Sequence, residues 1–118
     1  MTREPRDYLP LTPAMFHVLI ALADEPRHGY YILKDVAERT DNEVQLSTGT
    51  LYGLIKRLLD DELIVETATP RGEDERRRCY TLTAFGRQVA EAEADRLDRL
   101  VADARRRRLL ARARRVEE

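Results

Sequence analysis

Cysteine is nearly absent from this sequence, which excludes two common ways of stabilising a small protein. A chain of 118 residues with one cysteine can form no disulfide within itself, and a cysteine-based zinc site is excluded as well. The single thiol, Cys79, stands within a stretch expected to form a strand. A small, partly buried side chain is its expected role, because a redox sensor would need an exposed thiolate of low pKa.

Long apolar runs and catalytic motifs are missing too. No run approaches the length of a signal-peptide core or a membrane span, and the amino terminus is polar, so we expect a cytoplasmic protein without a membrane partner. The sequence has two histidines, no serine–histidine–acid spacing, no glycine-rich phosphate loop and no set of metal ligands. We therefore expect no enzymatic activity, no cofactor and no metal site.

An excess of charge of one sign is also lacking. Charged residues make up 36% of the chain, where about a quarter is usual, yet the formal net charge is −1. Net charge therefore neither predicts nor excludes a nucleic-acid partner. The distribution of charge is more informative, because arginines form runs at 76–78 and 105–108 while the acidic residues are spread along the chain.

Residues 46–59 carry the clearest pattern and predict a helix with two unlike faces. Ser47 is a candidate N-cap for this helix. Apolar residues at helical spacing form one face, namely Leu51, Leu54, Ile55, Leu58 and Leu59. The opposite face is formed by Gly49, Tyr52, Gly53 and Lys56.

This second face is unusual for a surface helix. Each glycine costs on the order of 1 kcal/mol of helix stability against alanine, but it lets the backbone approach another surface closely. Hydroxyls, a tyrosine and a lysine suit phosphates and base edges in a major groove. A core helix whose outer side is merely small and polar is the alternative. The candidate DNA-binding residues here are Ser47, Thr48, Gly49, Thr50, Tyr52 and Lys56.

Residues 1–10 are charged, carry two prolines and predict an arm. Thr12 followed by Pro13 predicts the start of a first helix, which we expect to end at residues 24–25. The expected core face of this helix is formed by Phe16, Leu19, Ile20 and Ala23.

A second helix is expected from residues 27–30 to residues 41–42. Followed by the helix at 46–59, it gives the helix–turn–helix arrangement that presents a recognition helix to DNA. His28 and Tyr30 stand at its amino end, where backbone amides favour a phosphate. A local cap is the alternative role for His28.

A β-hairpin is expected next, from β-branched residues 63–69 and a returning strand at 77–82. A hairpin after a reading helix is typical of winged helix-turn-helix domains. Its arginines suit phosphates or a narrow minor groove, and the candidate DNA contacts among them are Arg71, Arg76 and Arg77. The alternative is a solvated hairpin whose arginines pair with the acidic residues 73–75.

Thr83 is expected to cap the last and longest helix, which we expect to continue well past Arg105. Its apolar stripe is too long for one small domain to cover, so a second chain is expected to cover part of it. The candidate dimerisation residues are Phe85, Val89, Ala92, Leu97, Leu100, Val101 and Ala104.

Four stretches together resemble PadR-type transcriptional regulators. They are Leu11-Thr12-Pro13, His28-Gly29-Tyr30, Gly49-Thr50-Leu51-Tyr52 and Tyr80-Thr81-Leu82-Thr83-Ala84-Phe85-Gly86. The similarity covers roughly residues 11–90, and the length resembles the compact subgroup with a single carboxy-terminal dimerisation helix.

The resemblance implies a homodimer that binds a pseudo-palindromic operator in double-stranded DNA, usually as a repressor. It puts Thr48, Gly49, Thr50, Tyr52 and Lys56 on the reading helix, His28 and Tyr30 on the supporting helix, and Arg77 on the wing. Some members bind hydrophobic or aromatic compounds near the dimer interface and then release DNA, which makes a small-molecule effector a further expectation.

The sequence departs from the family pattern at two positions. Gly53 stands where the family often has proline, and Glu62 stands where a glycine commonly ends the recognition helix. If residue 62 must be left-handed, the glutamate carries about 1 kcal/mol of strain. Otherwise the helix ends differently and the wing angle shifts.

We therefore predict a mainly α fold with a small β-hairpin: an arm at 1–10, a winged helix-turn-helix DNA-binding domain at 11–83 and a dimerisation helix at 84–118. The predicted function is a sequence-specific DNA-binding transcriptional regulator. A winged-helix module that binds other proteins and not DNA is the alternative, favoured by the acidic hairpin loop and the near-zero net charge.

Overall fold

Helices and a small antiparallel sheet make up the described part of this computed structural model, residues 2–68 and 78–110. The helices are α1 (Pro13–Ala21), α2 (Gly29–Arg39), α3 (Thr48–Asp60) and α4 (Ala84–Arg106), preceded by a 3-10 turn, η1 (Pro5–Tyr8). The strands are β1 (Arg27–His28), β2 (Ile64–Thr67) and β3 (Cys79–Leu82). The predicted fold class is confirmed.

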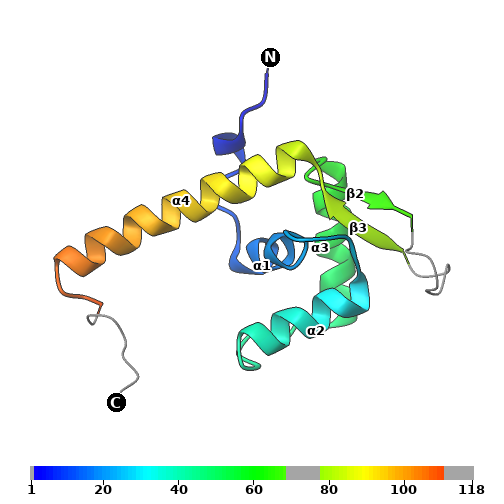
Figure 1. Cartoon of the computed structure of the whole chain (residues 1–118), viewed down its shortest axis with the longest axis horizontal. Helices are drawn as coiled ribbons and strands as arrows, with labels where there is room; N and C mark the ends of the chain where they lie inside the picture. The colour runs from blue at the N-terminus through cyan, green and yellow to red at the C-terminus, as the bar shows by residue number, and fades with distance from the viewer. Residues whose placement is uncertain (1, 69–77, 111–118) are drawn as a thin grey trace.

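The long helix α4 crosses over α1 and then leaves the body of the molecule, while α2 and α3 lie on the other side of α1 from it (Figure 1). None of the described helices is long and apolar enough to cross a membrane.

The three predicted hydroxyl caps are confirmed, and they fix where the helices start. Thr12 Oγ1 accepts from the Met15 amide at 3.2 Å, and Ser47 Oγ accepts from the Thr50 amide at 3.1 Å. The hydroxyl of Thr83 accepts from Gly86 at 2.8 Å. Each bond satisfies an amide that the first turn of a helix leaves without a partner.

The predicted end of α1 is wrong, and its predicted core face is confirmed only at Leu19, which is fully buried. The helix ends at Ala21, and its buried residues include Met15 and Val18, while Ile20 is 38% exposed. Phe16 and Ala23 are only partly buried. Because nearly every residue of α1 is apolar, helical spacing alone does not single out the side that faces the core.

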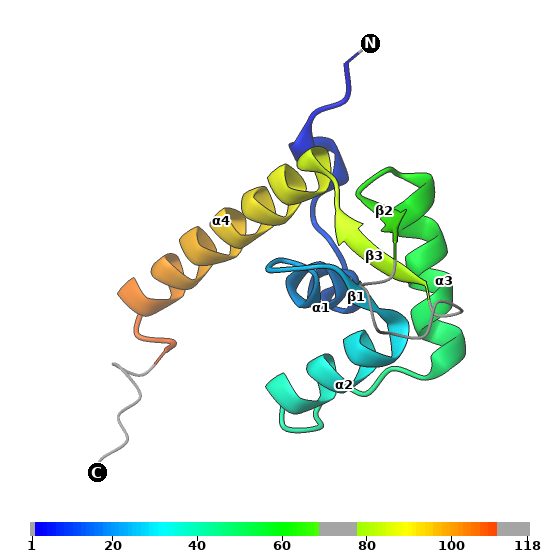
Figure 2. The same cartoon turned by 45° about the vertical axis from the view of Figure 1, so that its right-hand side comes forward.

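The sheet has the order β1-β3-β2, and all pairs are antiparallel. The predicted hairpin is present, with Ile64 opposite Leu82 and Thr67 opposite Cys79. Cys79 is 1% exposed, which confirms its expected place in the interior. The strand β1 was not predicted; Figure 2 shows it beside β3, where it joins the start of α2 to the hairpin.

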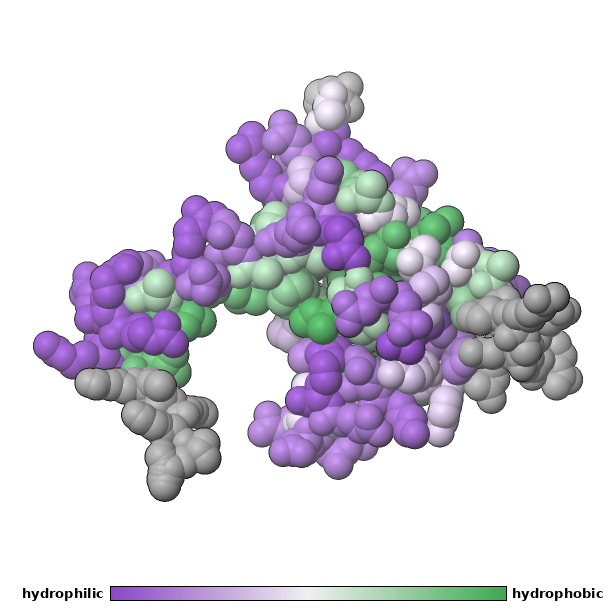
Figure 3. Space-filling view, in the orientation of Figure 1, coloured by the Kyte–Doolittle hydropathy of each residue, from purple (hydrophilic) through white to green (hydrophobic). Residues whose placement is uncertain are grey.

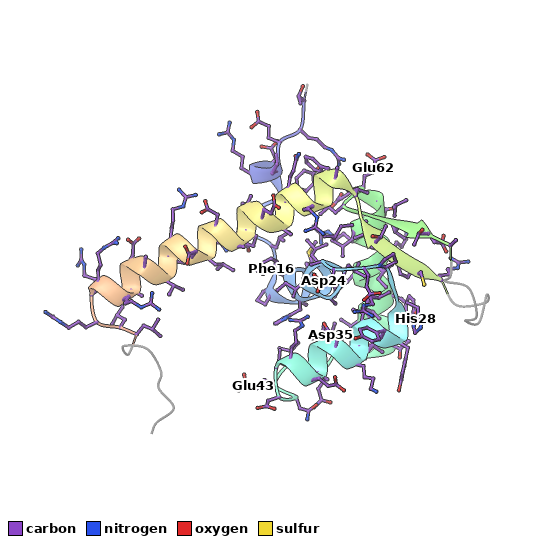
Figure 4. The ribbon with its side chains drawn as sticks, viewed as in Figure 1. Phe16, Asp24, His28, Asp35, Glu43 and Glu62 are labelled. Atoms are coloured by element: carbon purple, nitrogen blue, oxygen red, sulfur yellow. The ribbon has the colours of Figure 1, made fainter. Side chains whose placement is uncertain are left out.

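The turn between α3 and β2 has the left-handed conformation that the sequence left open. Glu62 has φ of 60°, its amide donates to Leu59, and the amide of Leu63 donates to Leu58. These two bonds form the Schellman motif that usually ends a helix at glycine. Glu62 lies where the end of α3 meets the start of α4 (Figure 4).

A close backbone contact then fixes the start of α4 against this turn. A Cβ on Gly86 would lie 1.8 Å from the carbonyl oxygen of Leu63, so only glycine fits. Further along, Val89 is fully buried. The expectation that α4 continues well past Arg105 is wrong: the helix ends at Arg106, and Arg108 has φ of 61° in a second Schellman turn that the arginine run did not signal.

Candidate nucleic-acid interface

The two faces of α3 are separated as the sequence predicts. Leu51, Ile55 and Leu58 are at most 2% exposed and lie in the core. The opposite face is open to solvent, and it presents Thr48, Gly49, Thr50, Tyr52, Gly53 and Lys56.

Both glycines on this face lie in open space. No atom outside the helix backbone comes within 4 Å of the position that a Cβ would occupy at Gly49 or Gly53. Packing within the chain therefore explains neither glycine. What the glycines provide is a bare strip of backbone that a flat or grooved surface can approach.

The amino end of α3 adds a group of hydroxyls. Ser47 Oγ donates to the Thr50 hydroxyl at 3.0 Å while accepting from the Thr50 amide. Ser47 therefore acts as the cap of the helix, and Thr50 beside it is exposed. This helix end, with its unsatisfied amides, suits a phosphate.

Tyr52 connects the exposed face of α3 to α2. A Cβ on Gly29 would lie 2.4 Å from the Tyr52 hydroxyl oxygen, so the tyrosine lies directly across this glycine. Burial raises the pKa of Tyr80, and the charge interaction with Tyr52 raises it further. Tyr52 remains 46% exposed and is thus both a spacer between helices and a surface group.

His28 and Tyr30 lie at the start of α2, as expected. His28 is the N-cap by backbone conformation without a side-chain cap bond, and its backbone pairs with Cys79 in the sheet. Figure 4 shows His28 on the side of the molecule that carries the hairpin. Tyr30 is 60% exposed.

Two basic side chains near this surface, Lys56 and Arg78, make exposed ion pairs with described residues. Lys56 Nζ lies 3.5 Å from Asp60, and Arg78 Nε lies 3.3 Å from Glu66. Such pairs are worth about 1 kcal/mol or less, so a phosphate can replace the carboxylate. Three candidate residues of the hairpin, Arg71, Arg76 and Arg77, lie outside the described residues.

The candidate dimerisation residues divide into two groups along α4. Phe85 and Val89 pack against the core of their own chain. Ala92, Leu97 and Ala104 are partly exposed, and Leu100 and Val101 are 55% and 40% exposed. Figure 3 shows hydrophobic surface on the underside of the part of α4 that has left the body.

Glu93 is a buried charge that the sequence did not single out. It is 2% exposed, and Oε2 accepts from the Leu11 amide at 3.1 Å. Arg96 donates to both carboxylate oxygens, at 2.6 and 3.0 Å. These bonds, with that of Arg96 foremost, lower the pKa of Glu93. The available signal was a carboxylate within the apolar stripe, four residues after Val89.

A pocket of about 450 Å³ lies between the amino-terminal segment, the start of α1 and the end of α3. Its lining residues include Tyr8, Leu9, Met15, Arg57 and Asp61. Within the described residues, no group of three or more potential metal-binding side chains comes together.

The sequence matches the family model of the transcriptional regulator PadR-like family over residues 18–92. It is 38% identical over 87 residues to an uncharacterized 37.1 kDa protein in transposon TN4556 of Streptomyces fradiae, a match that covers 74% of this chain and 24% of that protein. The chain spans less than two thirds of the length of the curated relatives that it matches.

Two solved structures have a similar fold. A PadR family transcription regulator from Clostridium difficile is 26% identical, with a TM-score of 0.68 over 78% of this chain and 94% of that one. BpsR from Bordetella bronchiseptica, whose DNA binding is regulated by 6-hydroxynicotinic acid, is 28% identical, with a TM-score of 0.60 over 79% and 64% of the two chains.

Proposed function

Because this chain belongs to the PadR-like family of transcriptional regulators, which act by binding DNA, we propose that it is a homodimeric repressor of a pseudo-palindromic operator. In this proposal α3 enters the major groove, and the start of α2 and the hairpin contact the flanking backbone. The observation that carries the proposal is the exposed face of α3, with two glycines that packing against the described residues does not explain.

The residues of this face fall into those that would contact phosphates and those that would contact bases, according to their side chains. Lys56 and the basic residues of the hairpin would neutralise phosphates, which supplies affinity without sequence preference. Thr48, Thr50 and Tyr52 would lie near base edges, where hydroxyls read donor and acceptor patterns. The glycines would let the helix backbone come close enough for these short side chains to reach.

Dimerisation is proposed from the free part of α4. Leu100 and Val101 lie on a helix that projects from the body, and an apolar stripe of this length favours burial against a second copy. Two copies would present two reading helices to the two halves of an operator.

An effector is proposed by analogy with BpsR, whose DNA binding responds to a small aromatic acid. We propose that this chain releases its operator on binding a small hydrophobic or aromatic compound. Aromatic side chains near the junction of the DNA-binding part and α4, such as Tyr8 and Phe85, suit a ligand of that kind.

The test is a fluorescence-anisotropy titration with DNA from the upstream region of its own gene and with a scrambled duplex, at two salt concentrations. Tighter, salt-sensitive binding to the upstream DNA, at one dimer per site, is the expected result. The alternative, a module that binds other proteins, predicts weak and equal binding to both duplexes. It also predicts that a selection from a library of random duplexes enriches no sequence.

A further inference from the structure

The amino-terminal segment has no part in the proposed DNA contacts, yet it is attached to the molecule at a defined place. The turn η1 lies against α4, and Tyr8 meets Phe85 edge-on with ring centroids 5.5 Å apart. Arg3 reaches further, to the turn where α3 ends. Its guanidinium donates to the Asp61 carbonyl at 2.6 Å and to the Glu62 carboxylate at 3.3 Å.

The same guanidinium also touches the first turn of α4. The central carbon of the guanidinium lies 4.2 Å from the centroid of the Phe85 ring. Its Nη1 donates a hydrogen bond to the Tyr8 hydroxyl at 3.0 Å. One cation therefore bridges the last residues of α3 and the first turn of α4. Both contacts are favourable in general, because the carbonyl end of a helix and the face of an aromatic ring each attract a cation.

Arg3 adds little to the core that this junction encloses. Its side chain is 37% exposed, whereas Leu63 and Val89, which lie in the core at the junction, are fully buried. A pocket separates part of the segment from α3, and among the described residues the hydrogen bonds from the segment to the end of α3 are those of Arg3. Loss of Arg3 should leave the fold intact, because Thr83 still bonds to the carbonyls of Glu62 and Leu63, at 2.7 and 3.1 Å, and Gly86 still packs on Leu63. These contacts hold the start of α4 at one point, and the loss of Arg3 should relax the angle that the two helices make about that point.

We propose that Arg3 is a positioning residue for DNA recognition: it fixes the angle between α3 and α4, and thereby the separation of the two reading helices in the dimer. The inference rests on the proposed function, since the angle matters for DNA only where α4 joins two copies. Half-sites read by such dimers lie about 34 Å apart, one turn of the double helix. A change of angle at the junction moves α3 relative to α4, and therefore moves the reading face of each copy relative to that of its partner.

The angle is followed through the distance between two spin labels on one chain, attached at Lys56→Cys on α3 and Arg99→Cys on α4. Pulsed electron–electron double resonance measures the distribution of this distance. Labelled chains are diluted into unlabelled protein, and the buried Cys79 is replaced by serine in every sample if it takes up label. We expect a narrow distance distribution with Arg3 and a broader one with Arg3→Ala. The matched control is Arg6→Ala, because Arg6 belongs to the same segment and is 80% exposed, and its ion pair within the described residues is with Glu4 of the same segment.

The consequence for DNA is measured with duplexes whose two half-sites are moved apart in single base-pair steps. Arg3→Ala should lose about tenfold in affinity at the preferred spacing, discriminate less between spacings, and bind an isolated half-site as the unchanged protein does. Arg3→Lys, which keeps the charge without the planar fork, should lie between the two. Circular dichroism melts check that all variants fold.

Identical distance distributions for Arg3→Ala and the unchanged protein would overturn the inference, as would an unaltered spacing preference. Failure of the proposed function is a separate result. A chain that binds no DNA or forms no dimer would refute that proposal, while the intramolecular distances would still decide whether Arg3 fixes the angle.

Discussion

Gly53 is a residue at which folding and DNA binding make opposite demands. No atom outside the helix backbone lies within 4 Å of where its Cβ would stand. Gly53→Ala should therefore raise the free energy of unfolding by up to about 1 kcal/mol, because alanine favours the helix. The added methyl group would stand between α3 and DNA, so operator affinity should fall. Chemical denaturation and anisotropy titration of the same sample measure the two effects.

Gly29→Ala provides the contrast to this variant. Its Cβ would meet the Tyr52 hydroxyl at 2.4 Å, so this substitution should lower stability and binding together. A Gly53→Ala protein that is more stable and binds the operator as tightly as before would show that this part of α3 does not approach DNA closely.

Glu62 carries strain in the backbone, since its φ is 60°. A side chain in the left-handed region costs about 1 kcal/mol relative to glycine, so Glu62→Gly should raise the free energy of unfolding by up to that amount. The carboxylate is 77% exposed, and its loss removes only a weak ion pair with Arg3. Glu62→Ala removes the same pair but keeps the Cβ. In denaturant titrations the free energy of unfolding should therefore be higher for Glu62→Gly than for Glu62→Ala. Equal free energies of unfolding would argue against strain at this residue.

Glu93 makes stability depend on pH in the acid range. Hydrogen bonds from Arg96 and from the Leu11 amide hold its folded-state pKa below the ordinary value of 4.5. A group whose folded-state pKa is lowered stabilises the fold above its unfolded-state pKa, and this contribution is lost as pH falls through the folded-state value. Glu93→Gln should therefore flatten the decline of melting temperature below pH 4.5.

The control for this prediction is Asp98→Asn, which removes a carboxylate from an exposed position of the same helix. Its melting temperature should decline with pH as steeply as that of the unchanged protein. If Glu93→Gln follows the same curve as Asp98→Asn, the buried carboxylate is not a source of acid sensitivity.

At the scale of elements, the sequence predicted what local chemistry determines. The hydroxyl caps of three helices and the two faces of α3 depend on neighbours within one or two turns, and all are confirmed. The strand β1 could not be predicted, because it has two residues and exists only through pairing with β3, far along the chain. The buried side of α1 is likewise decided by its neighbours, since nearly every residue of the helix is apolar.

The same distinction applies to the candidate site. Gly29 and Gly86 were recognisable as members of family motifs, but their physical reasons, the Tyr52 ring and the Leu63 carbonyl, lie on other elements. Arg3 and Glu93 looked like ordinary charges in charged stretches. Only the folded chain brings one to the α3–α4 junction and buries the other.

Lys56, in the last turns of α3, is the proposed phosphate contact of this helix. Lys56→Ala should weaken binding to operator and scrambled DNA alike, and should reduce the slope of log affinity against log salt by about 1 for each copy's lost phosphate contact. Asp60→Asn should act in the opposite direction, because it releases Lys56 from its exposed pair at 3.5 Å. Anisotropy titrations over a salt series measure both, and an unchanged slope for Lys56→Ala would remove Lys56 from the phosphate contacts.

At the scale of the whole molecule, α4 serves two purposes in succession. Its first half completes the core of its own chain through Val89 and the buried Glu93. Its second half projects from the body (Figure 1) and carries the exposed apolar side chains of Leu100 and Val101. A truncation directly after Gly86 would therefore remove core residues, so that loss of the dimer could not be distinguished from unfolding. Substitutions beyond Leu97 test dimerisation without removing core residues.

The double substitution Leu100→Glu and Val101→Glu puts charge on the exposed stripe, where the two side chains are 55% and 40% exposed. We expect a folded monomer, because neither residue contributes to the core, and burying two carboxylates against a second copy is unfavourable. Sedimentation velocity should show the change in mass, and affinity for the full operator should fall by at least about 100-fold as the two linked half-sites become independent. Asp98→Ala and Arg99→Ala, on the same helix but off the stripe, should remain dimeric. A double variant that is still dimeric would place the interface elsewhere, and a double variant that is monomeric yet binds the full operator undiminished would show that one winged helix is enough.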